Sequence, residues 1–223
     1  MENLHEIGLK YGTDKAYFHE FTKVYEDIFS EHRHKKIKFL EVGIWVGSSL
    51  IMWEEYFTNA IIYGADKFTD EVRIDISKKY LDGKYKDIKF NDLKTKTFVV
   101  DQEIESELLT LPNDLDIIIE DGGHTMIQQQ ISLNTLFMKK LKSGGIYILE
   151  DLHTSNEIYW ESYGGNSKNN TLRLLKDLSE KSLSYDNDYY INDVDFQLLV
   201  DEIDSIEIFK VKENSITSII RKK

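Results

Sequence analysis

The chain has 223 residues, of which 41% are hydrophobic and 12% aromatic, as in a folded domain and not a disordered segment. Its net charge of −12 argues against a general nucleic-acid binder, because phosphate binding needs a basic face. It has no cysteine, and so no disulfide, thiolate metal site or cysteine nucleophile. Because no apolar run reaches about 18 residues and the N-terminus is polar, we expect a cytoplasmic protein without a membrane partner.

Residues 1–36 are predicted to form an N-terminal extension, followed by one main domain over residues 37–223. Apolar residues at helical spacing predict a helix from Tyr17 to Phe29. The polar segment before that helix has two interpretations. It is either a helix cap made by Thr13 or Asp14, or a lid over a cofactor, with Thr13 and Lys15 among the cofactor-binding residues.

The segment 39–50 is predicted to contain a strand, a glycine turn and the start of a helix. This is the pattern of the first βα unit in a nucleotide-binding α/β sheet. Gly43 lets the backbone turn sharply, and Gly47, followed by Ser48, lets a ligand approach the helix N-terminus. Glu41 places a carboxylate where a cationic or hydroxylated ligand group would lie.

The spacing of this glycine loop discriminates between cofactors. A dinucleotide fingerprint reads Gly-x-Gly-x-x-Gly, whereas this loop reads Glu-x-Gly-x-x-x-Gly. An acid before the loop would repel a pyrophosphate but would suit the ammonium of a methionine-like group. The loop resembles motif I of the class I S-adenosylmethionine (SAM) methyltransferases, although such a loop is also compatible with an ordinary strand-to-helix turn.

Two further strand ends carry acids that suit a nucleoside. The strand 61–66 ends at Asp66, where the usual acceptor for ribose hydroxyls lies in such sheets. A helix is predicted at about 71–80, with a turn at Asp82-Gly83. The next strand ends near Asp101, which is either an acceptor for the adenine amino group or a plain surface acid.

Three carboxylates, from Asp121, Glu150 and Asp151, follow the fourth and fifth predicted strands, which are apolar and should be neighbours. Crowded carboxylates repel one another unless they are protonated or neutralised by a cation. Oxygen ligands suit Mg²⁺ or Mn²⁺, so we expect a metal site here; the alternative is that the acids only cap helices. A glycine stop at Gly144-Gly145 is predicted to end the helix between these two strands.

His124 follows Asp121 within a Gly-Gly turn, and is predicted to be the general base beside the metal. The segment 154–170, rich in Tyr, Trp, Ser, Asn and Gly, follows a strand end and is predicted to bind substrate, with Tyr159 and Trp160 as contacts; the alternative is an ordinary surface connection. His153, just before this segment, is a weaker candidate for the base, and either supports the site or binds substrate. A helix is expected at about 171–182. Alternation of apolar and polar residues over Ile203–Lys212 and Ser215–Arg221 predicts a terminal antiparallel pair.

Together these segments resemble the metal-dependent class I methyltransferases that include macrolide-sugar O-methyltransferases and cephalosporin-hydroxylase-type proteins. Similar proteins occur in bacterial capsule and surface-polysaccharide gene clusters. The matching pieces span most of positions 10–155 and are Tyr11-Gly12-Thr13-Asp14-Lys15 with His19, Leu40-Glu41-Val42-Gly43, Ser49-Leu50-x-x-Trp53, Asp121-Gly122-Gly123-His124, and Gly144-Gly145 through Glu150-Asp151.

The resemblance implies a Rossmann-like α/β fold with strand order 3-2-1-4-5-7-6, SAM at the glycine loop, and Mg²⁺ or Mn²⁺ on Asp121, Glu150 and Asp151. It implies methyl transfer to an oxygen of a small-molecule or sugar-linked acceptor, including phosphoramidate or phosphate-linked groups. It weakens beyond Ser155, and leaves open the acceptor and the oligomeric state, a homo-oligomer included. Two other functions stay open: an NAD-dependent oxidoreductase and a non-catalytic SAM- or nucleotide-binding module.

Overall fold

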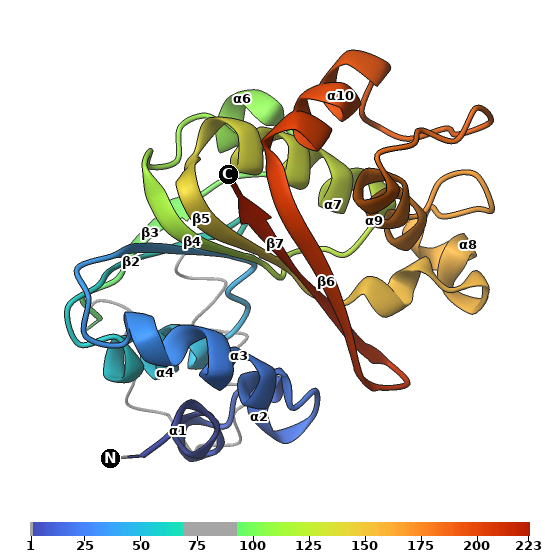
Figure 1. The fold of residues 1–223 in the computed structure, drawn as a ribbon. Helices are drawn as coiled ribbons and strands as arrows, with labels where there is room; N and C mark the ends of the chain where they lie inside the picture. Colours follow the sequence, from blue (N-terminus) through green and yellow to red (C-terminus); the bar gives the residue numbers. More distant parts are fainter. Residues whose placement is uncertain (1, 69–92) are drawn as a thin grey trace. The chain divides into compact units, whose positions relative to one another are not determined.

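The computed structural model describes residues 2–68 and 93–223 (Figure 1). The chain divides into two compact units, Met1–Val100 and Asp101–Lys223. The helix predicted at about 71–80 and the turn at Asp82-Gly83 lie outside the described residues. The strands form one seven-stranded sheet in the order β3-β2-β1-β4-β5-β7-β6. This order confirms the prediction. In the part of the chain that the structure describes, every helix is too short or too polar to cross a membrane.

The described residues of the first unit contain three parallel strands and several helices. β1 pairs with β2, which in turn pairs with β3. The strands are β1 (Lys38–Val42), β2 (Ile61–Asp66) and β3 (Lys96–Val99). The helices are α1 (Leu4–Tyr11), α2 (Asp14–Tyr17), α3 (Phe21–Phe29), the 3-10 turn η1 (Ser30–His32) and α4 (Ser48–Tyr56).

The N-terminal helices belong to the hydrophobic core of this first unit. Phe29 of α3 packs with Phe39 of β1 and Trp53 of α4, and the Phe39 and Trp53 ring centroids lie 5.1 Å apart. Helix α3 is therefore packed against the strand that leads into the glycine loop. The predicted role of residues 1–36 as a lid stays a prediction.

The helix predicted from Tyr17 to Phe29 is confirmed from Phe21 onward, as α3, but its predicted start is wrong. Glu20 adopts a left-handed conformation with φ 58°, which separates α2 from α3. Helix α1 was not predicted, although its N-terminus carries a capping box in which Asn3 accepts from the Glu6 amide and Glu6 accepts from the Asn3 amide. That pattern, with Gly12 beyond the helix end, is the signal that could have located α1.

The second unit contains four strands and the remaining helices. β4 and β5 are parallel, and β7 runs antiparallel to both β5 and β6. The strands are β4 (Leu115–Glu120), β5 (Leu141–Leu149), β6 (Ile203–Lys212) and β7 (Ser215–Lys222), so the terminal antiparallel pair is confirmed. The helical segments are α6 (Glu105–Leu108), α7 (Met126–Ser132), the π-helix η3 (Leu133–Phe137), η4 (Leu152–Ser155), η5 (Glu157–Tyr159), α8 (Trp160–Tyr163), α9 (Thr171–Glu180) and α10 (Asp193–Glu202).

The predicted glycine stop at Gly144-Gly145 is wrong. Both residues lie inside β5, where the pairing with β4 jumps from Leu141 to Ile146 across a bulge. Gly144 takes φ 73°, which glycine tolerates without strain, so the pair shapes a bulge in the strand. Helix α10 was also missed, although Asn192 caps it by accepting from the Asp195 amide.

Candidate functional site

The glycine loop of the first unit is held by a carboxylate from the next strand. Gly43 and Gly47 both have φ 82°, so the loop needs glycine at these two positions. Asp66 Oδ2 accepts hydrogen bonds from the Ile44 amide at 3.0 Å and the Trp45 amide at 3.1 Å. Asp66, at the end of β2, therefore fixes the backbone of the loop that was predicted to bind the cofactor. Its predicted contact with a ribose stays a prediction.

Glu41 and Lys15 form a buried ion pair in the same unit. Lys15 Nζ lies 3.3 Å from Glu41 Oε1, and the side chains are 1% and 0% exposed. Ser49 Oγ donates to Glu41 Oε2 at 2.7 Å. Two residues close to this pair in the sequence are also buried: Thr13, at the N-cap of α2, and Ser48, at the start of α4. The pair joins the Tyr11–Lys15 segment to β1, a link that the sequence alone did not reveal.

Asp101 begins the second unit, beyond the end of β3. Its Oδ1 accepts from the Glu103 amide at 3.0 Å, and its own amide donates to Glu107 Oε2 at 2.7 Å. These bonds form the turn that leads into α6. The predicted contact of Asp101 with an adenine stays a prediction.

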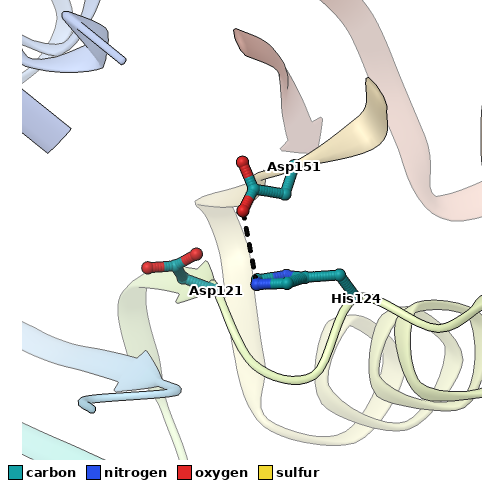
Figure 2. Close-up of side chains that lie close together, drawn as sticks. All are labelled: Asp121, His124 and Asp151. Carbon is teal, nitrogen blue, oxygen red and sulfur yellow. Dashed lines mark ion pairs between the residues drawn. The ribbon is translucent and has the colours of Figure 1, made fainter. Parts of the chain in front are cut away.

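Three side chains in the second unit converge in a geometry that could hold a metal ion. The carboxylate or imidazole atoms that Asp121, His124 and Asp151 offer all lie within 4.8 Å of one another (Figure 2). His124 Nε2 lies 3.3 Å from Asp151 Oδ2. The convergence follows from the sheet, because Glu120 pairs with Leu149 and the parallel strands β4 and β5 therefore end side by side.

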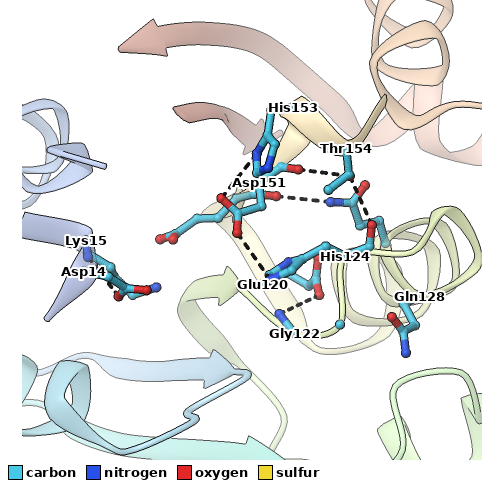
Figure 3. Close-up of polar contacts among 12 residues, drawn as sticks. Asp14, Lys15, Glu120, Gly122, His124, Gln128, Asp151, His153 and Thr154 are labelled. Carbon is cyan, nitrogen blue, oxygen red and sulfur yellow. Dashed lines mark hydrogen bonds and ion pairs between the residues drawn. The ribbon is translucent and has the colours of Figure 1, made fainter. Parts of the chain in front are cut away.

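Among the described residues, Glu150 is not part of this three-residue group, although it precedes Asp151 directly. Its side chain is buried, its amide donates to the Glu120 carbonyl at 3.0 Å, and its carbonyl accepts from Gln129 Nε2 at 3.1 Å. Whether its carboxylate binds a metal stays a prediction. His153 lies on the other side of Asp151, with Nδ1 3.6 Å from Asp151 Oδ1 (Figure 3).

The turn between Asp121 and His124 is fastened by two side chains that the sequence did not single out. Glu120 Oε1 accepts from the Gly122 amide at 3.2 Å and from Gln102 Nε2 at 2.7 Å. Gln102 Oε1 in turn accepts from the Gly123 amide at 2.8 Å. This pairing of a buried acid with a buried amide depends on tertiary structure, so no short motif could have predicted it.

Burial raises the pKa of the Glu120 carboxyl from its ordinary value of 4.5 to about 7. The neighbouring Asp121 charge adds to this rise, while His124, Gln102 and the Gly122 amide oppose it. Glu120 is fully buried directly before the first acid of the group. It therefore holds the turn from the buried side.

The predicted substrate segment folds into short helices. Tyr159 lies edge-on to His153, with ring centroids 5.3 Å apart, and Trp160 Nε1 donates to the Ser155 carbonyl at 2.8 Å. Ile158, directly before Tyr159 in sequence, is 80% exposed. The segment therefore has a defined conformation beside Asp151, and its contact with substrate stays a prediction.

The order of the strands and the helices that flank them are those of the class I SAM-dependent methyltransferase fold. The solved structure of MycE methyltransferase from the mycinamycin pathway, in complex with Mg, SAH and mycinamycin VI, superposes with a TM-score of 0.74. The two sequences are 24% identical, and the match covers 99% of this chain and 54% of that chain.

Curated relatives at higher identity are sugar O-methyltransferases. Mycinamicin VI 2''-O-methyltransferase of Micromonospora griseorubida is 30% identical over 193 residues, which is 79% of this chain and 43% of the relative. Demethylmacrocin O-methyltransferase of Streptomyces fradiae is 32% identical over 180 residues, 74% of this chain and 39% of the relative. The chain thus spans about two fifths of the length of these relatives. No protein-family model matches it.

Proposed function

We propose that the chain is a SAM- and divalent-metal-dependent O-methyltransferase that acts on an oxygen of a sugar-linked or other small-molecule acceptor. The observation that supports this most is the convergence of Asp121, His124 and Asp151 at the carboxyl ends of two parallel strands. The sugar O-methyltransferase relatives, and a similar fold that binds Mg and SAH, support the same function.

In this proposal most of the residues that bind the methyl donor belong to the first unit. The loop with Gly43, Gly47 and Ser48 would receive the methionine part of SAM, and Asp66 its ribose. Asp66 already orders the loop through two amide bonds, so one carboxylate would serve both the loop and the ligand. The remaining residues proposed for SAM are Glu41, Thr13, Lys15 and, for the adenine, Asp101. Bound SAM would supply an electrophilic methyl group.

The donor set of the second unit fits a divalent cation. Asp121 and Asp151 bring two carboxylates together, and a cation would relieve their mutual repulsion. Hard cations such as Mg²⁺ and Mn²⁺ prefer carboxylate oxygens to imidazole, so we assign Asp121 and Asp151, with Glu150, as ligands. A bound cation would supply positive charge that lowers the pKa of an acceptor hydroxyl.

His124 is left with the role of general base. Its Nδ1 is buried and has no hydrogen-bond partner among the described residues, while its Nε2 faces the Asp151 carboxylate. A neutral imidazole there would accept the proton of the acceptor hydroxyl as the methyl group is transferred. His153, Tyr159 and Trp160 would contact the acceptor beside it.

The acceptor is proposed to be a sugar hydroxyl of a natural product, because curated relatives methylate oxygens of rhamnosyl tetracenomycin and of olivosyl-oleandolide. A capsule or surface-polysaccharide acceptor, including one with a phosphoramidate group, is the second candidate. It follows from the motif resemblance described above.

Incubation of the whole chain with labelled SAM, Mg²⁺ and a panel of demethylated sugar acceptors tests the proposed function. We expect label in the acceptor, loss of transfer with EDTA and recovery with added Mg²⁺. Calorimetry with S-adenosylhomocysteine and with NAD tests the rivals. Binding of NAD without binding of S-adenosylhomocysteine would favour the oxidoreductase. Binding of S-adenosylhomocysteine with no transfer to any acceptor would favour the non-catalytic module.

A further inference from the structure

Two residues of the converging group formed by Asp121, His124 and Asp151 adopt a backbone conformation that is unfavourable for them. His124 has φ 60° and Asp151 has φ 53°, and both are left-handed without being glycine. Such conformations cost on the order of 1–3 kcal/mol each, and they persist only where the surroundings hold them. The structure must therefore contain contacts that keep these two residues in place.

One buried hydroxyl contacts both residues. Thr154 Oγ1 lies 3.1 Å from the carbonyl oxygen of His124 and 3.0 Å from that of Asp151 (Figure 3). The side chain of Thr154 is 0% exposed, so water does not compete for this hydroxyl. A hydroxyl has one proton, which is shared between these two acceptors.

The two contacts have different origins. The bond to Asp151 spans three residues, and is the ordinary local bond of a threonine in a helical turn, here η4. The bond to His124 spans 30 residues and joins the turn after β4 to the turn after β5. Local structure does not account for this second bond, so it points to a tertiary role.

We propose that Thr154 is a positioning residue for the converging group of Asp121, His124 and Asp151, which contains two of the proposed metal ligands. Its hydroxyl ties the backbone of His124 to that of Asp151, which keeps the Asp151 carboxylate and the His124 imidazole aimed at one point together with Asp121. This inference rests on the proposed function, because it concerns the cation that the proposed enzyme would bind. It deepens that function by assigning the residue that sets the geometry of the site.

The test compares two variants of the whole chain in the absence of SAM and acceptor. Thr154→Val removes the hydroxyl and keeps the shape of the side chain, whereas Thr154→Ser keeps the hydroxyl. The readout is the affinity for Mn²⁺, followed by electron paramagnetic resonance or calorimetry. We expect Thr154→Val to weaken binding by about 10- to 100-fold, as is usual for groups that orient metal ligands, and Thr154→Ser to bind nearly as the wild type does.

A matched control separates positioning from stability. Thr22 is also fully buried, and its hydroxyl lies 2.8 Å from His5 Nδ1 in the first unit. We expect Thr22→Val to lower the unfolding temperature without changing Mn²⁺ affinity. If Thr154→Val is too unstable to assay, Thr154→Ala removes the same hydroxyl and must weaken Mn²⁺ binding likewise.

Two results would overturn this inference and leave the proposed function intact. One is wild-type Mn²⁺ affinity in Thr154→Val, and the other is an equal loss of Mn²⁺ affinity in Thr154→Val and Thr154→Ser. A lower unfolding temperature with unchanged affinity would likewise reduce Thr154 to a structural residue. A wild-type chain that binds no divalent cation at all would overturn the metal requirement of the proposed function, and this inference with it. The wild-type titration therefore tells the two failures apart.

Discussion

The ammonium of Lys15 and the carboxylate of Glu41 form an ion pair 3.3 Å long that is buried inside the first unit. The pair connects a segment before the sheet to the strand that enters the glycine loop. Removal of one partner from a buried pair leaves an uncompensated charge, which is far more costly than loss of an exposed pair. The link between Lys15 and Glu41 therefore makes the N-terminal segment part of the folding unit that would bind SAM.

Lys15→Met is expected to destabilise the chain by about 3–5 kcal/mol, because the Glu41 carboxylate is left buried without its cation. Urea unfolding measures this change, and Lys23→Met, which removes an exposed lysine, is the control that should leave stability almost unchanged. Combining Lys15→Met with Glu41→Gln should cost less than the sum of the single changes. Strict additivity would mean that the two residues are not coupled.

Asp66→Ala is expected to weaken binding of S-adenosylhomocysteine by about 10- to 100-fold, because the loop amides of Ile44 and Trp45 lose a charged acceptor. Asp66→Asn, which keeps one carbonyl oxygen, should lose less. Calorimetry measures both, and Asp27→Ala on the exposed face of α3 should bind as the wild type does. Unchanged affinity in Asp66→Ala would remove Asp66 from the cofactor site.

Glu120 should make the stability of the metal-free chain fall as the pH rises. Its pKa is about 7 in the folded chain against 4.5 ordinarily, so the folded state binds the proton more tightly than the unfolded state. The free energy of unfolding should therefore decrease by about 3 kcal/mol between about pH 4.5 and pH 7, and this contribution should level off on either side. Glu120→Gln, measured by urea unfolding in EDTA, should remove that decrease. A variant with the wild-type pH profile would contradict the assignment.

Gly122→Ala should disrupt the turn through its neighbour Gln102. A Cβ at position 122 would lie 1.7 Å from Gln102 Oε1, so the amide side chain must move and give up its bonds to Glu120 and Gly123. We expect a clear loss of both stability and Mn²⁺ affinity in Gly122→Ala. In a Gln102→Ala background, the same substitution should add little further loss. An equal loss in both backgrounds would show that Gln102 is not the obstacle.

His124→Ala distinguishes a base from a metal ligand. As a base, His124 should account for about 10²–10⁴-fold in kcat, while affinities for Mn²⁺ and S-adenosylhomocysteine stay close to those of the wild type. As a ligand, its loss should weaken Mn²⁺ binding directly. His34→Ala, at an exposed histidine of the first unit, controls for the loss of an imidazole. Near-wild-type kcat in His124→Ala would move the base role to His153.

Local patterns in the sequence located most of the strands, whereas the order of the sheet came from the resemblance to a known family. Apolar runs such as Ile117–Ile119 and the alternation in β6 and β7 located the strands, and β4 and β5 then brought Asp121 and Asp151 together. The helix boundaries were less accurate. Glu20 and Gly144 use left-handed conformations that the composition around them did not indicate.

The tertiary contacts of the site could not be read from the sequence. Gln102 and Thr154 lie 21 and 30 residues from the turn that they hold, and neither belongs to a recognisable local motif. The same is true of Lys15, whose partner Glu41 depends on how helix α2 packs. Such contacts are set by packing, so only the structure reveals them.

The left-handed backbone at His124 and Asp151 has a consequence for engineering this chain. Glycine is the residue that accepts such dihedral angles without strain, so a search for thermostable variants by backbone criteria alone would select glycine at both positions. Those substitutions would delete an imidazole and a carboxylate of the proposed site. A thermostabilisation campaign should therefore leave positions 124 and 151 unchanged and seek its gains elsewhere, such as the exposed faces of α9 and α10.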